Sequence, residues 1–262
     1  MSTAVLVTRP AAEAVRWQQA LSARGFAARA LPLIDIAPAT DTAALRAAGQ
    51  RLADCMAVMF VSVHAVQYWF EQNGAPAQAG SASNAIETRA WSPGPGTSRA
   101  LLAHGWPADR LDEPAADAAQ FDSEALWSRV QPQVQAGRRV LIVRGGNAQG
   151  RSAGRAWLAD RLREAGVQVD EVVAYRRLPP VWSTAQQQQA SAAAADGSVW
   201  VFSSSEAIAN LGQLLPGRDW RAARAVATHP RIEQAARALG FGDVRASRPA
   251  LDDVAASIES FG

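Results

Sequence analysis

Two short stretches place hydroxyl groups directly after an apolar run. MFVSVHAV (59–66) contains Ser62, and VFSSSEAI (201–208) contains Ser204 and Ser205. A hydroxyl at a strand-to-helix junction can cap the helix, and the unpaired N–H groups there, at the positive end of the helix dipole, also bind anions. Each serine is therefore either a helix cap or a contact to an anionic ligand.

Other polar side chains stand at the ends of predicted strands. Tyr175 ends the run VVAY, Arg9 follows AVLVT, and Arg144 lies in LIVRGG. Thr97 comes directly after the turn SPGPG. Ligands of open parallel sheets bind at the carboxyl ends of strands, so these side chains are candidates for one binding region. The structural alternatives are packing of the linker against a domain for Tyr175 and capping of the sheet for Arg9.

The composition excludes several kinds of site. The chain has 262 residues, one cysteine (Cys55), no lysine and three widely spaced histidines. It therefore has no intramolecular disulfide, lysine Schiff base or P-loop lysine, and no histidine spacing typical of a metal site. The arginines are scattered, which argues against nucleic-acid binding. No apolar run suits a membrane span and no secretory signal is evident, so we expect a cytoplasmic protein.

Short apolar runs alternate with helical patterns along the whole chain. The predicted strands are 4–10, 26–30, 56–60, 85–91, 138–146, 167–175, 198–202, 224–228 and 243–247. The predicted helices are 11–23, 41–52, 63–71, 97–103, 121–130, 156–166, 182–195, 204–214, 230–239 and 250–260. This alternation predicts an α/β fold with parallel sheets.

Two proline-flanked extended segments, near 32–38 and 173–180, are the predicted linkers. They divide the chain into a discontinuous first domain, 1–36 plus 177–262, and a second domain, 38–173. The two hydroxyl-bearing corners would then be equivalent positions in two similar domains. AWSPGPGTSRALLAHG follows the first corner and AVATHPRIEQAARALG follows the second, each giving a strand, a turn, a helix and a closing glycine.

A series of motifs in this order resembles the uroporphyrinogen-III synthase family. The matching pieces are VLVTRP, PLIDIAP, PGPGTSRALLAHG, FDSEALW, LIVRG followed by GRAWL, VVAYRRLPP and LDDVAASI. The resemblance covers essentially the whole chain. It implies two flavodoxin-like three-layer lobes with parallel sheets, joined by a two-stranded linker, with the substrate in the cleft between them.

The resemblance also implies the chemistry. The family takes linear hydroxymethylbilane, a tetrapyrrole polycarboxylate, removes its terminal hydroxyl, inverts the last pyrrole ring and closes the macrocycle, without metal or cofactor. Tyr175 is the implied catalytic residue, which helps the hydroxyl to leave. The implied substrate-binding residues are Arg9, Ser62, Thr97, Arg144, Ser204 and Ser205. Ile232, at the repeat position of Thr97, and His64, where the family often has Asn or Arg, depart from the pattern.

Two other functions fit an α/β chain of this length. A two-lobe sensor that binds a small molecule without catalysis would share the architecture. A nucleotide-dependent oxidoreductase is disfavoured, because no strand is followed by GxGxxG and the first strand leads into TRPAAEA, which has no glycine. We expect a monomer, and we leave open a transient contact with the preceding enzyme of the pathway.

Overall fold

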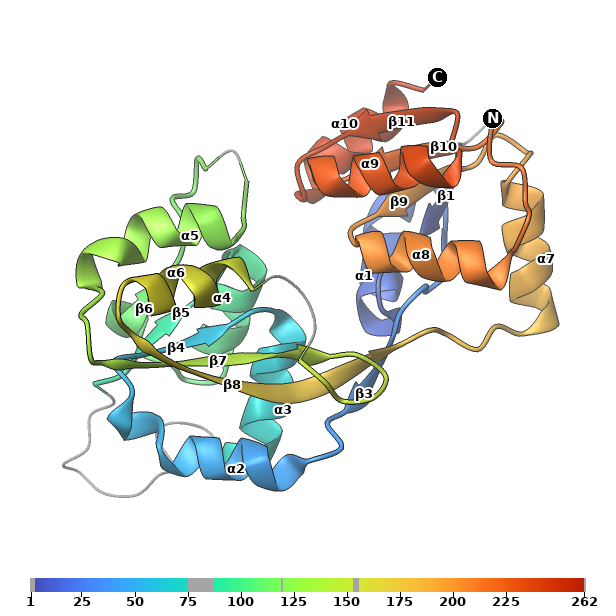
Figure 1. Cartoon of the computed structure of the whole chain (residues 1–262). Helices are drawn as coiled ribbons and strands as arrows, with labels where there is room; N and C mark the ends of the chain where they lie inside the picture. The colour runs from blue at the N-terminus through green and yellow to red at the C-terminus, as the bar shows by residue number, and fades with distance from the viewer. Residues whose placement is uncertain (1–2, 75–86, 119, 153–155, 262) are drawn as a thin grey trace. The chain divides into compact units, whose positions relative to one another are not determined.

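The structure is a computed structural model that describes residues 3–74, 87–118, 120–152 and 156–261. The chain forms two compact units. One contains Met1–Ile36 with Leu178–Gly262, and the other contains Ala37–Arg177. Each unit is an α/β sandwich whose sheet carries helices on both faces (Figure 1). The predicted α/β class with predominantly parallel sheets is therefore confirmed.

The first unit is built on a five-stranded sheet in the order β11-β10-β9-β1-β2, with every pair parallel. The strands are β1 (Ala4–Val7), β2 (Ala27–Ala30), β9 (Val199–Phe202), β10 (Arg224–Ala227) and β11 (Asp243–Ala246). The helices are α1 (Ala11–Ser22), α7 (Thr184–Ala193), α8 (Ser205–Leu214), α9 (Pro230–Leu239) and α10 (Leu251–Glu259).

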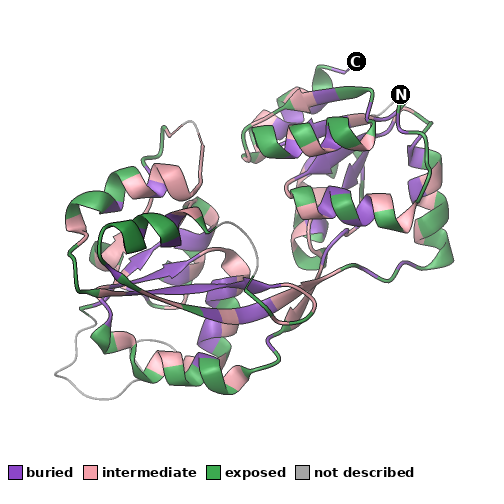
Figure 2. Ribbon diagram, viewed as in Figure 1, coloured by how far each residue is buried: buried purple, intermediate pink, exposed green. Residues whose placement is uncertain are grey.

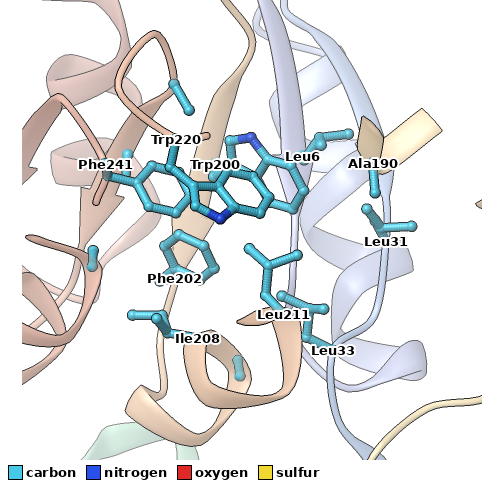
Figure 3. Packing of buried hydrophobic residues seen from close by; sticks show 14 of the residues in the cluster. Leu6, Leu31, Leu33, Ala190, Trp200, Phe202, Ile208, Leu211, Trp220 and Phe241 are labelled. Atoms are coloured by element: carbon cyan, nitrogen blue, oxygen red, sulfur yellow. The ribbon is translucent and has the colours of Figure 1, made fainter. Parts of the chain in front are cut away.

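Alternation along the central strands divides the core of this unit in two. Val5 and Val7 of β1 pack with residues of α1 and α10, whereas Leu6 packs on the opposite side with residues of α7, α8 and α9. On that side Trp200 and Phe202 of β9 meet Trp220 and Phe241 in edge-to-face and stacked pairs (Figure 3). Both faces of the sheet are thus buried, as continuous apolar strands predict.

The second unit has a six-stranded sheet in the order β3-β8-β7-β4-β5-β6. Its strands are β3 (Asp35–Pro38), β4 (Ala57–Phe60), β5 (Arg89–Trp91), β6 (Leu111–Asp112), β7 (Arg139–Gly146) and β8 (Gln168–Leu178). Its helices are α2 (Thr42–Gln50), α3 (Val63–Asn73), α4 (Pro95–Ala103), α5 (Ser123–Val130) and α6 (Trp157–Glu164). The central strands of both sheets are buried, whereas the helices turn exposed residues outward (Figure 2).

The two sheets have the same spatial order of equivalent strands, although these strands follow one another differently along the chain. β8-β7-β4-β5-β6 in the second unit corresponds to β2-β1-β9-β10-β11 in the first, and β3 is an additional edge strand. The two hydroxyl-bearing corners therefore join equivalent elements, β4 to α3 and β9 to α8. This is the internal duplication that the sequence predicts, and it makes the strand of Arg144 equivalent to the strand of Arg9.

Three local features differ from the sequence prediction. Helix α4 begins at Pro95, two residues before the predicted start, because proline suits the first helical position. β8 runs on to Leu178, through the residues expected to be linker, because it lies between β3 and β7 in the sheet. β6 has only two residues, too few to give a periodic pattern.

Candidate active site

Tyr175 and Ser62 lie together at the carboxyl end of the second unit's sheet. Tyr175 belongs to β8, and Ser62 follows β4, two strands away across β7 (Figure 1). Their hydroxyl oxygens are 3.0 Å apart and share a hydrogen bond. Ser62 is also the N-cap of α3, where its hydroxyl accepts the Ala65 N–H at 3.2 Å. Only 4% of Tyr175 is exposed, so this bond holds an almost fully buried ring.

An irregularity in the pairing of β7 with β8 brings Tyr175 to this place. Arg144 pairs with Val173, but the next residue, Gly145, pairs with Tyr175, so the register shifts by one residue at Ala174. The tyrosine ring then passes over Gly145. A Cβ atom at Gly145 would lie 2.6 Å from Tyr175 Cζ and 2.8 Å from its hydroxyl oxygen. Glycine is therefore required under the ring.

Two further side chains from α3 surround the tyrosine. The ring of His64 lies 5.5 Å from that of Tyr175, tilted by 47°, and Tyr68 stacks on Tyr175 at 6.2 Å with the planes 19° apart. His64 and Tyr68 share one face of the helix because they are four residues apart. Burial, together with the nearby Glu71 carboxylate, raises the pKa of Tyr68. Both tyrosines of the chain thus belong to one aromatic cluster.

Arg144 is bound within its own sheet. Its Nη1 donates to Glu171 Oε2 at 2.7 Å, with 6% of the arginine side chain and 22% of the glutamate side chain exposed. Glu171 also accepts from Arg163 and from Ser152. Burial opposes the ionisation of Glu171, but the hydrogen bonds from Arg144, Arg163 and Ser152 outweigh it and lower the pKa of the carboxyl group. This network joins β7, β8 and α6.

In the first unit, Ser204 caps α8 by accepting the Glu206 N–H at 3.2 Å, as Ser62 caps α3. Ser205 is the first residue of the helix and donates to the Arg231 carbonyl at 3.4 Å. Arg9 pairs with Glu13 at 3.2 Å and lies over the Trp17 ring, 4.1 Å from its centroid. Burial lowers the pKa of Arg9, against the attraction of Glu13.

Thr97 is buried inside the first turn of α4 rather than at its cap, because that helix starts at Pro95 with Gly94 as N-cap. Ile232 is likewise the third residue of α9, which begins at Pro230 and is capped by the His229 side chain. The predicted match between Thr97 and Ile232 is thus found in the structure. The equivalent position in the first unit is apolar and packs into the core.

Neither a metal site nor a membrane-spanning helix is found among the described residues. In the part of the chain that the structure describes, no three His, Cys, Asp or Glu side chains gather as a metal site. No helix within the described ranges combines the length and the hydrophobicity that a bilayer crossing requires.

Comparison with known proteins assigns the family. The family model described as uroporphyrinogen-III synthase HemD matches residues 15–256.

The chain belongs to the uroporphyrinogen-III synthase family.

Solved structures agree with this assignment at the level of the fold. A mutant uroporphyrinogen III synthase from the extremely thermophilic bacterium Thermus thermophilus is 15% identical, with 98% of each chain covered and a TM-score of 0.57. The uroporphyrinogen-III synthetase from Helicobacter pylori 26695 is 13% identical, with 90% of this chain and 93% of that chain covered and a TM-score of 0.57. Uroporphyrinogen-III synthases are cyclising lyases of heme biosynthesis that act on a tetrapyrrole, so the chain is an enzyme of that class.

Two parts of the tyrosine cluster were not predicted from the sequence. Gly145 was not singled out, although a double glycine at the end of an apolar strand indicates a close approach of another group. Tyr68 lies in the middle of a helix, where a tyrosine commonly packs against neighbours or lies at the surface. Its spacing from His64 and from the Ser62 cap indicates a shared face of α3, but only the fold shows that Tyr175 lies against that face.

Proposed function

We propose that this synthase uses Tyr175 to assist the departure of the terminal hydroxyl of hydroxymethylbilane. This departure is the first step of the ring closure that gives uroporphyrinogen III. The observation that supports the role is the fixed phenol, held by Ser62 at 3.0 Å and seated over Gly145. A pyrrole nitrogen already helps to expel the hydroxyl from the neighbouring carbinol carbon. A positioned hydrogen-bond donor is therefore sufficient as the general acid.

The substrate carries carboxylates on every pyrrole, and helix N-termini are suitable partners for them. We propose that the starts of α3, α4 and α8 bind acetate and propionate groups through backbone N–H groups, near Ser62, Thr97, Ser204 and Ser205. Arg9 and Arg144 are proposed to contribute positive potential while paired with Glu13 and Glu171. A cytoplasmic location, a monomeric state and contact with the preceding enzyme stay predictions from the sequence.

The decisive experiment is a coupled assay with freshly generated hydroxymethylbilane. The reaction is stopped with acid and oxidant, and the uroporphyrin isomers are separated by chromatography. We expect mainly isomer III in the presence of the protein, because the spontaneous reaction closes the ring without inversion and gives isomer I. Isomer I alone, at the spontaneous rate, would refute the activity and support a binding module.

The role of Tyr175 is tested by Tyr175→Phe in the same assay. The change keeps the ring over Gly145 and removes the hydroxyl, so we expect kcat to fall by about 100-fold, as for the loss of a general acid. Formation of isomer III at an unchanged rate would leave the activity standing and exclude Tyr175 as the acid.

A further inference from the structure

The hydrogen bond between Ser62 and Tyr175 has two possible directions. A serine hydroxyl has one proton to donate and two lone pairs that accept. One lone pair of Ser62 Oγ takes the Ala65 N–H. The hydroxyl then either accepts the proton of Tyr175 on its second lone pair or donates its own proton to Tyr175 Oη.

The surroundings of Ser62 favour donation to the tyrosine. Because its oxygen accepts the Ala65 N–H, the hydroxyl is polarised and becomes a stronger donor. Ser62 also caps α3, so the positive end of the helix dipole lies beside the pair. Negative charge on Tyr175 Oη would be stabilised by both, and most strongly at the moment when the tyrosine gives up its proton.

We infer that Ser62 is a positioning residue that donates its hydrogen bond to Tyr175 Oη, directs the tyrosine proton toward the substrate and stabilises the phenolate that forms. This inference rests on the proposed role of Tyr175. In that step the C–O bond of the terminal carbinol breaks, and its electron pair goes to the oxygen. That oxygen takes the Tyr175 proton and leaves as water. The pyrrole nitrogen supplies electrons to the carbon, and the proton that a ring carbon releases after closure returns to Tyr175.

Substitutions at Ser62 can separate this donation from helix capping. In Ser62→Asp the carboxylate still accepts the Ala65 N–H, so the cap remains, but it has no proton to donate. Ser62→Thr keeps both the acceptor and the proton. We expect kcat to be about 10- to 100-fold lower in Ser62→Asp than in Ser62→Thr, as for the loss of a hydrogen bond to a charged group.

Ser183→Ala is the matched control for capping. Ser183 caps α7 in the first unit by accepting the Gln186 N–H, and it is exposed. Its loss removes a cap of the same kind without touching the tyrosine, so kcat should not change. If Ser62→Asp keeps the kcat of Ser62→Thr, the inference is overturned.

A spectroscopic readout reports on the bond itself. The chain has two tyrosines, so ¹³C-labelled tyrosine in a Tyr68→Phe background gives one Cζ resonance, that of Tyr175. Adding Ser62→Asp should shift this resonance, because phenol Cζ senses hydrogen bonds to its oxygen, whereas adding Ser183→Ala should not. An unchanged resonance in Ser62→Asp would also overturn the inference.

The failure of this inference can be told from the failure of the proposed function. If Tyr175→Phe turns over normally, the proposed role of Tyr175 is wrong and the inference falls with it. If Tyr175→Phe is impaired while Ser62→Asp is not, only the inference is wrong. If Ser62 acts through Tyr175, Ser62→Asp causes no further loss of kcat in a Tyr175→Phe background.

Discussion

A methyl group at Gly145 should displace the tyrosine ring. In Gly145→Ala the new Cβ would lie 2.6 Å from Tyr175 Cζ, 2.8 Å from its oxygen and 2.9 Å from Cε2, whereas ordinary contacts of Cβ atoms begin at 3.4 Å. The ring must therefore retreat, and an ordinary contact requires a retreat equal to the difference between 2.6 and 3.4 Å. The bond from Tyr175 to Ser62 is already 3.0 Å long, and such a retreat would take it beyond hydrogen-bonding distance.

Both activity and stability should respond to this change. A displacement on the order of 1 Å in a catalytic group can cost about 100-fold in rate, so kcat for isomer III should fall to a similar extent as in Tyr175→Phe. Overpacking a filled site typically costs about 1–3 kcal/mol in the free energy of unfolding, which urea denaturation would measure. Gly96→Ala is the stability control, because its Cβ would meet only Val63 Cγ2, at 3.7 Å.

A double-mutant cycle tests the stated cause. In a Tyr175→Leu background the ring atoms that crowd Gly145 are absent, so Gly145→Ala should there have little effect on the free energy of unfolding. The same penalty in both backgrounds would show that the strain has another origin. Full activity and stability in Gly145→Ala alone would refute the seating of Tyr175 over this glycine.

Two further predictions concern the charged network and the thiol. Arg144→Leu should lower the free energy of unfolding by about 2 kcal/mol near pH 7, since it removes a hydrogen bond between charged groups that is largely shielded from water. Because the pKa of Glu171 is lowered in the fold, this stabilisation is present above the ordinary glutamate pKa and is lost as the pH falls through the folded value. Urea denaturation of both proteins at several pH values should therefore show a smaller loss of stability in acid. A loss that does not change with pH would contradict the assignment. Burial, followed by the Asp170 carboxylate, raises the pKa of Cys55, so the thiol of the native protein should react slowly with a disulfide reagent. In denaturant one equivalent of thiol should react rapidly. Rapid labelling of the native protein would contradict this.

The sequence was sufficient for most of the helices and strands and for the equivalence of the two corners. Short apolar runs between helical patterns mark strands whose two faces are buried, and this is a local property. The repeated corners at Ser62 and Ser204 follow from the same local pattern, in which a strand ends, a hydroxyl caps and a helix starts. The start of one helix, which the sequence placed wrongly, is also a local property. Thr97 was expected at a helix start, but Pro95 favours an earlier one.

The sequence did not predict which residues are neighbours on adjacent strands, because hydrophobic periodicity indicates burial but not which strand lies alongside. Arg144 was predicted as a substrate contact at the end of a strand, and the fold places Glu171 beside it on β8. The additional residue at Ala174 shifts the register and sets Tyr175 over Gly145, and no composition or spacing rule gives such a shift.

The sequence by itself therefore determined the α/β architecture, the family and the candidacy of Tyr175 and Ser62, because each depends on residue type and local order. Only the tertiary structure decided that these two hydroxyl groups share a hydrogen bond, although 113 positions separate them in the chain. The reason is the strand order, which places β8, β7 and β4 side by side and lets a tyrosine on the first reach a serine beyond the last.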